Sequence, residues 1–259
     1  MSNSLFSLFA FALLVFPGTM REYALIPGKY SDFALDQQGN IIMADAEGII
    51  SKKDPAGRTL ASQAYSNHGG NPQIDASNGL QVLVYFPSTR HLLMLDNQLN
   101  QRRLVDFNTL ENYQIRGLGL AADGNYWILD GRDGFLKKLD YEGRTLASTM
   151  LAGAWLPNGQ TRIYDDGQYL FLAGENDETV RVLNATLNRL RLFTKPAGYW
   201  DARDGNLCYA IDSQRLVREG ISIGSRRDTV EVQGNALQRF RLSGSILANR
   251  SDRGLHLYR

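Results

Sequence analysis

The chain has 259 residues, of which 43% are hydrophobic and 21% are charged, so it is long enough to bury a core in one or two globular domains. The formal net charge is +1 and the 28 lysine and arginine residues are spread along the chain, which argues against a nucleic acid or another polyanion as a partner. A single cysteine, Cys208, excludes a disulfide framework within the chain and a cysteine-rich metal site.

The N-terminal segment LFSLFAFALLVF (residues 5–16) is apolar apart from Ser7 and is followed by Pro17-Gly18-Thr19. It is too short to cross a bilayer as a helix, but it suits the apolar part of a signal peptide. No lysine or arginine precedes it and no small-x-small cleavage pattern follows it, so a buried helix or a misassigned start codon is the alternative. We expect a signal peptide over residues 1–20 and a single exported domain over residues 21–259, without a transmembrane span.

Two stretches of the chain nearly repeat each other. Residues 48–62 are GIISKKDPAGRTLAS and residues 134–148 are GFLKKLDYEGRTLAS, with nine of fifteen positions identical and a separation of 86 residues. Half of that separation is 43, which is close to the period of a propeller blade. An eroded copy, LLMLDNQLNQRRLVDF, lies midway and has Asp96 at the position of Asp54 and Asp140.

A second landmark has the same period. Residues 36–45 (DQQGNIIMAD), 122–130 (ADGNYWILD) and 204–212 (DGNLCYAID) combine a Gly-Asn turn with an apolar run that ends in Asp. Glycine at such a turn supplies the positive φ of a tight hairpin. Successive turn glycines are 40, 45, 43, 38 and 39 residues apart, at Gly39, Gly79, Gly124, Gly167, Gly205 and Gly244.

The third of these units is predicted to contain four strands, at residues 117–121, 125–129, 135–139 and 144–150. DPAG (54–57) and DYEG (140–143) are hairpin turns between the last two strands of their units. Four strands about every forty residues indicate an all-β, six-bladed β-propeller of four-stranded antiparallel blades. The competing arrangement, a sandwich of two sheets, does not require turns at constant spacing.

The last unit is predicted to lack its outermost strand. Its strands cover residues 237–242, 245–250 and 255–258, after which the chain stops. The spare apolar segment EYALI at residues 22–26 precedes the first unit. We expect it to pair with the C-terminal strand and complete the last blade, because an unpaired edge would otherwise remain.

The pattern D-x-x-G-N-apolar-x-apolar-x-D, followed by D-x-x-G, resembles the blades of NHL-type six-bladed propellers. The residues that carry the resemblance are Asp36, Gly39, Asn40, Asp45, Asp54 and Gly57 in the first unit, Gly124, Asn125, Asp130, Asp140 and Gly143 in the third, and Asp204, Gly205, Asn206 and Asp212 in the fifth. The second, fourth and sixth units depart from it. An apolar leader followed by one degenerate propeller is similar to exported propeller proteins of Bacteroidota. The resemblance implies a fold and no particular activity.

Candidates for chemistry are few. His68, His91 and His256 form no pair at metal-ligand spacing. Asp36, Asp75, Asp165 and Asp201 fall on or next to predicted innermost strands, where six-bladed metal-dependent lactonases hold their cation. Asp36 and Asp165 fit the turn pattern, which leaves Asp75 and Asp201 as weak metal candidates. Glu175, Asp177 and Glu178 form an acidic turn without the spacing of a calcium loop.

A propeller collects the connections between its blades, and the loops between second and third strands, on one face. The residue types enriched at interface hot spots are Trp, Tyr and Arg. We predict that this loop face carries Tyr65, His68, Arg90, Tyr113, Arg132, Trp155, Tyr199 and Trp200. Function should therefore be sought in the connections at residues 63–71, 107–115 and 151–161. The alternative is that Trp155 and Trp200 fold inward and cap the core.

These features favour a non-catalytic binding or scaffold module whose loop face holds a protein or peptide partner. The leader and the resemblance place it in the periplasm or at the outer membrane, within a cell-envelope assembly. No cofactor is expected, with calcium or another divalent cation as the alternative. Two other functions stay open: a metal-dependent lactonase- or lyase-like enzyme with a site on the central axis, and a glycan-binding module that stacks sugars on Trp155, Trp200 and Tyr65.

Overall fold

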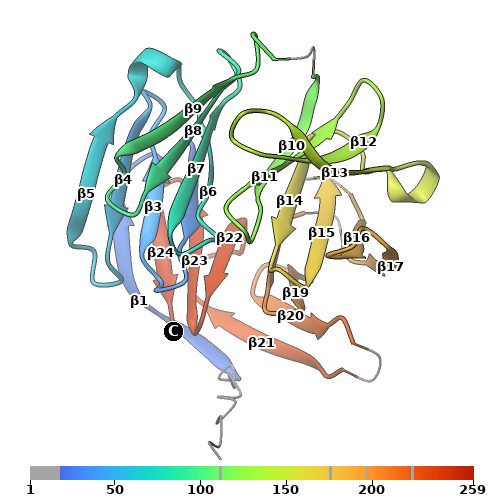
Figure 1. The fold of residues 1–259 in the computed structure, drawn as a ribbon. Coiled ribbons are helices and arrows are strands. Elements are labelled where there is room, and N and C mark those ends of the chain that lie inside the picture. Colours follow the sequence, from blue (N-terminus) through green and yellow to red (C-terminus); the bar gives the residue numbers. More distant parts are fainter. Residues whose placement is uncertain (1–17, 111–112, 175–176, 197, 223–224) are drawn as a thin grey trace, which may run out of the picture.

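A computed structural model describes residues 18–110, 113–174, 177–196, 198–222 and 225–259 (Figure 1). The expected signal peptide lies almost wholly outside the described residues. Two short 3₁₀ helices, η1 (Ser66–His68) and η2 (Gly153–Trp155), accompany a succession of strands. Within the described ranges no helix has the length and apolarity that a membrane crossing requires.

The strands, in chain order, are β1 (Thr19–Pro27), β2 (Asp32–Leu35), β3 (Ile41–Ala44), β4 (Ile49–Lys53), β5 (Thr59–Ala64), β6 (Gln73–Asp75), β7 (Gln81–Phe86), β8 (His91–Asp96), β9 (Gln101–Asp106), β10 (Ile115–Leu120), β11 (Tyr126–Asp130), β12 (Phe135–Leu139), β13 (Thr145–Met150), β14 (Thr161–Asp165), β15 (Tyr169–Gly174), β16 (Thr179–Asn184), β17 (Arg189–Thr194), β18 (Trp200–Arg203), β19 (Asn206–Ala210), β20 (Arg215–Gly220), β21 (Arg227–Gln233), β22 (Arg239–Ser243), β23 (Ile246–Ser251) and β24 (Gly254–Tyr258).

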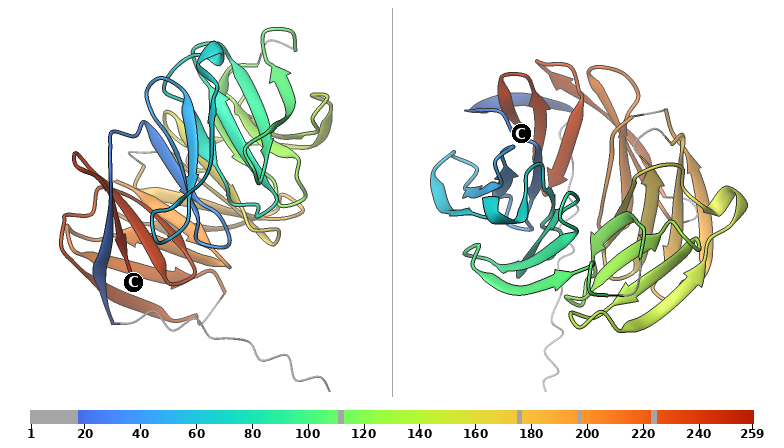
Figure 2. Two further views of the ribbon diagram at one scale, coloured as in Figure 1. Left: turned by 90° about the vertical axis from the view of Figure 1, so that its left-hand side faces the viewer. Right: turned by 90° about the horizontal axis from the view of Figure 1, so that it is seen from above.

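Consecutive strands pair antiparallel in groups of four, which we call units 1 to 5: β2–β5, β6–β9, β10–β13, β14–β17 and β18–β21. Unit 6 consists of β22, β23, β24 and β1. Seen from above, the units follow one another in sequence order around a ring (Figure 2). The four strands expected for the third unit are present, and their boundaries differ from the prediction by no more than two residues.

The repeated stretch forms the outer half of units 1 and 3. In both copies the turn aspartate, Asp54 or Asp140, accepts hydrogen bonds from two backbone N–H groups and from the arginine four residues later. Gly57 and Gly143 have φ values of 84° and 80°, a conformation that side chains with a Cβ rarely adopt. The residues that the two copies share therefore form the turn and the outermost strand that follows it.

The N-terminal strand closes the ring as expected. β1 pairs antiparallel with β24, from Glu22 opposite Tyr258 to Pro27 opposite Gly254. β1 is longer than predicted, and residues 19–21 pair parallel with residues 231–233 of β21. Units 5 and 6 are therefore joined into one sheet of eight strands, so β1 covers two edges that would otherwise be open.

Units 3 and 4 also share a sheet, because their innermost strands β10 and β14 pair parallel. The sequence IRGLGL supplies the two glycines that this close approach requires. A Cβ on Gly117 would lie 2.9 Å from the carbonyl oxygen of Thr161, and a Cβ on Gly119 would overlap the carbonyl of Ile163. Only glycine therefore fits at positions 117 and 119, where β10 approaches β14.

The core is divided into apolar clusters, each formed by two neighbouring units. One cluster joins units 1 and 2, and the others join units 2 and 3, 3 and 4, 4 and 5, and 5 and 6. The cluster that includes Ile26, Phe33 and Leu257 joins unit 6 back to unit 1. Since no unit buries its faces alone, the ring itself is the folding unit.

Candidate functional site

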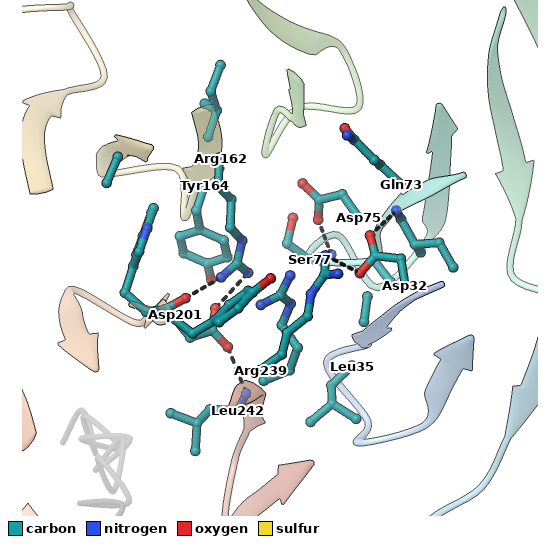
Figure 3. Close-up of a pocket in the computed structure, with 18 of the residues that line it drawn as sticks. Asp32, Leu35, Gln73, Asp75, Ser77, Arg162, Tyr164, Asp201, Arg239 and Leu242 are labelled. Carbon is teal, nitrogen blue, oxygen red and sulfur yellow. Dashed lines mark hydrogen bonds and ion pairs between the residues drawn. The ribbon is translucent and has the colours of Figure 1, made fainter. Parts of the chain in front are cut away.

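The innermost strands surround a cavity of about 100 Å³ on the central axis (Figure 3). Side chains alternate along a strand, so every second residue of these strands faces the axis. β14 contributes Arg162 and Tyr164, β18 contributes Asp201 and Arg203, and β22 contributes Arg239 and Arg241. Asp32 from β2 and Asp75 from β6 lie opposite, so charged groups line a space that neighbouring units share.

Three carboxylates of the cavity each link their own unit to the following one: unit 1 to 2, unit 2 to 3 and unit 5 to 6. The accepting side chains are on β2, β6 and β18, and the donors are backbone N–H groups of the following unit. Asp32 accepts from Ile74 at 2.8 Å, Asp75 from Leu120 at 2.9 Å, and Asp201 from Leu242 at 2.7 Å. A buried backbone N–H without a partner is costly, so these bonds satisfy groups that the gaps between units would leave unpaired.

Two of the same carboxylates also form ion pairs. Asp32 lies 2.8 Å from Arg239, and Asp201 lies 2.7 Å from Arg162. Burial acts to raise the pKa of Asp201, but the guanidinium groups of Arg162, Arg241 and Arg203 outweigh burial and hold the pKa below its ordinary value. Asp201 is therefore a stable anion within the cavity wall.

The arginines of the cavity have fewer ion-pair and hydrogen-bond partners than its carboxylates. Arg241 is 6% exposed, and its guanidinium donates to the carbonyl of Phe240 at 3.0 Å. None of the ion pairs found among the described residues includes Arg241. Burial and the nearby Arg162 lower the pKa of Arg241 to about 10. The buried Nε atoms of Arg203 and Arg239 also lack hydrogen-bond partners.

The weak metal candidates Asp75 and Asp201 line this cavity, but their oxygens are taken up by N–H donors. In the part of the chain that the structure describes, no group of three or more His, Cys, Asp or Glu residues could hold a metal ion. The four guanidinium groups make the cavity unfavourable for a divalent cation, because like charges repel.

The other carboxylates that the sequence singled out have structural partners. Asp36 and Asp165 accept backbone N–H bonds within their turns, as the turn pattern predicted. Of the acidic turn, Glu175 lies outside the described residues. Asp177 is buried and pairs with Arg181 at 2.5 Å.

The aromatic residues predicted for the loop face divide by burial. Tyr65, Tyr113 and Trp200 are 9%, 5% and 2% exposed, which is a correction to their expected place on a binding surface. Their rings pack into apolar clusters because large aromatic side chains gain most from burial. Trp200 thus caps the core, as the alternative reading expected, whereas Trp155 and Tyr199 are half-buried.

The remaining loop-face candidates are partly connected: the carbonyl of His68 accepts a hydrogen bond from Thr89, the neighbour of Arg90. His68 is 8% exposed, and its Nδ1 lies 3.0 Å from Nδ1 of His91. Arg90 is half-buried and donates to the carbonyl of Tyr113 at 2.6 Å. Arg132 is exposed and lies 4.0 Å from Asp130. His68, Arg90 and Tyr113 thus lie along one run of contacts, whereas Trp155 and Tyr199 belong to connections further round the ring.

The sequence patterns did not identify the axial arginines as part of a site. Their signal is present as charged residues at every second position of short, otherwise apolar strands: TRIY, WDAR and RFRL. Such alternation predicts a strand with one polar face. It does not tell whether that face meets water or the centre of a ring, which is why the pattern was not recognised as a site.

No protein-family model matches the chain, and no curated protein matches it in sequence. Solved structures do match in fold. The β-propeller domain of Cps50 (Swd1) from Myceliophteria thermophila aligns with a TM-score of 0.63 and 10% identity, over 92% of this chain and 99% of that one. The chain has the β-propeller fold.

Two further structures show the same fold. A streptogramin B lyase aligns with a TM-score of 0.58 and 11% identity, over 93% of this chain and 97% of the lyase. A chain of a mitotic checkpoint complex aligns with a TM-score of 0.55 and 15% identity, over 88% of this chain and 73% of that one. The neighbours thus include an enzyme and a chain of a protein complex, and the likeness concerns the fold alone.

Proposed function

We propose that the chain is a six-bladed propeller that serves as a non-catalytic binding or scaffold module for a protein or peptide partner. Units 1 to 6 are its blades, with β1 as the outermost strand of the last one. The closed series of clusters, in which the sixth unit packs on the first, supports this count. The partner binds on the loop face, where the connections between units meet.

The observation that carries the proposal is a pair of half-buried aromatic side chains, each with a guanidinium group on its ring. The guanidinium of Arg189 lies 5.5 Å from the ring centre of Trp155, and that of Arg239 lies 5.3 Å from that of Tyr199. Both rings belong to connections that enter an innermost strand, β14 or β18. Aromatic residues held rigidly by arginine lose little entropy on binding and are typical of interface hot spots.

Two alternatives are supported less well. The likeness to a lyase extends to the fold only, and the axis of this chain presents arginines where a metal-dependent enzyme needs cation ligands. A glycan-binding site would rest on Trp155, because Tyr65 and Trp200 are buried. Export to the periplasm or the outer membrane, within a cell-envelope assembly, is a proposal that rests on the apolar leader and the resemblance to exported propellers.

The experiment is co-purification from native extracts with the wild-type chain and with Trp155→Ala and Tyr199→Ala. We expect each substitution to reduce recovery of the partner about tenfold, since a hot-spot residue contributes about 1–2 kcal/mol or more. Leu80→Ala is the matched control. Leu80 is 80% exposed and lies in the turn between β6 and β7, on the opposite face.

Melting temperatures of all variants establish that they are folded. If Trp155→Ala does not fold, Arg189→Ala removes the exposed cation that lies on the same ring. Equal recovery with Leu80→Ala and with the loop-face variants would refute the proposal. A divalent metal that remains through purification, and whose chelation lowers the melting temperature, would favour the enzyme instead.

A further inference from the structure

We propose that the axial cavity binds a small free oxyanion, a carboxylate or a phosphate, with Arg241 as its principal ligand. The proposal rests on the charges and unsatisfied donors of the cavity. It shares Tyr199 and Arg239 with the loop-face proposal, whereas Trp155 lies outside the cavity wall.

The first step is the balance of charge. Four guanidinium groups line the cavity, from Arg162, Arg203, Arg239 and Arg241, and they face the carboxylates of Asp32, Asp75 and Asp201. The cavity thus carries one excess positive charge. The carboxylates also have other partners, because each accepts at least one hydrogen bond from a backbone N–H of the following unit. Within this wall one positive charge is unmatched, and Arg203 also borders a second hollow, which is lined by Asp165, Asp166 and Asp204.

The second step identifies where that charge belongs. Arg241 is the most deeply buried of the four arginines, and a single carbonyl accepts its only hydrogen bond among the described residues. Its neighbours Arg203 and Arg239 each have a buried Nε–H without an acceptor. Buried donors in native proteins are almost always satisfied, and an uncompensated buried charge is more costly still. Unsatisfied buried donors from two arginines, beside the single hydrogen bond of the Arg241 guanidinium, indicate a missing acceptor.

The third step concerns the size and chemistry of the ligand. A cavity volume of about 100 Å³ exceeds the roughly 10–15 Å³ of such space that one water molecule needs, so the cavity has room for a small oxyanion. Guanidinium groups present parallel N–H donors that match the oxygens of carboxylate and phosphate. The polar side chains of Gln73, Ser77 and Gln160 complete the wall and provide further hydrogen-bonding groups.

The test measures thermal unfolding in acetate, phosphate and sulfate, with sodium chloride at equal ionic strength as the reference. At about ten times the dissociation constant, a ligand of the native state should raise the melting temperature of a chain of this size by about 3–5 °C. Arg241→Met removes the guanidinium with little change in length, and we expect it to abolish this rise. We also expect it to change the stability measured in chloride only slightly, because removing a desolvated guanidinium offsets the loss of its attraction to Asp201 and Asp32.

The matched control is Arg226→Met, which makes the same change of charge at a side chain that is 90% exposed. It should keep the full response. A response to all three oxyanions no larger than to chloride would overturn the proposal, as would an unchanged response in Arg241→Met. If that variant does not fold, wild-type crystals soaked in selenate decide. An anomalous peak beside Arg241 would support the site, and an empty cavity would refute it.

Discussion

Asp201 makes the strongest of the carboxylate links between units, and its replacement by alanine should be severely destabilising. The side chain is 4% exposed and accepts hydrogen bonds from Leu242 N–H and from Arg162, both at 2.7 Å. Leaving the buried N–H without an acceptor costs about 1–3 kcal/mol. Removing one member of a buried ion pair costs about 3–5 kcal/mol. Since Arg162 is 26% exposed, water can solvate its guanidinium and lower the cost of losing the ion pair. We therefore expect a total loss of about 3–5 kcal/mol in the free energy of unfolding.

The assay is urea unfolding at neutral pH, with the free energy of unfolding extrapolated to water. Asp75→Ala is the internal comparison. Asp75 accepts two backbone N–H bonds but has no ion pair among the described residues, and it is half-buried. Its replacement should cost about 1–3 kcal/mol. The reasoning fails if Asp201→Ala costs under about 1 kcal/mol, or no more than Asp75→Ala.

Three further outcomes follow from the geometry. Gly119→Ala should cost about 2–3 kcal/mol in urea unfolding, because a Cβ would overlap the carbonyl of Ile163; a neutral result would contradict the close approach of β10 and β14. Burial and the adjacent His91 lower the pKa of His68. Because the unfolded chain then binds more protons, stability should fall as pH drops below about 6.5, by at most about 1.4 kcal/mol per pH unit. His68→Gln should remove that part of the pH dependence, and an unaltered profile would exclude the histidine pair as its source. Burial raises the pKa of Cys208 to about 12, so a thiol reagent at pH 8 should label it only upon unfolding; rapid labelling of the native protein would show that β19 is more accessible than the structure indicates.

The regular features of the fold could be predicted because they depend on neighbours in the chain. Asp54 and Gly57 define a turn by hydrogen bonds and a φ value that span five residues. The same pattern therefore marks the same turn at Asp140 and Gly143. The pairing of β1 with β24 could also be inferred, because a strand was missing at one end of the chain and a spare strand was present at the other.

The candidate site was not predictable in the same way. Trp155 and Trp200 both follow an Ala-Gly-x sequence, yet one is half-buried and the other lies in the core. The burial of Trp200 is decided by residues such as Tyr164 and Phe171, which belong to a different unit. A local pattern contains no information about which unit packs against it.

The sequence by itself thus determined the turns, the strand periodicity and the closure of the ring, since each follows from hydrogen bonds and alternation along short segments. Only the tertiary structure decided the chemistry of the axis. Asp201 meets Leu242, and Arg241 lacks a partner, because the innermost strands of different units converge at the centre. Charges that are ordinary on separate strands become a concentrated, partly unsatisfied group where those strands surround one cavity.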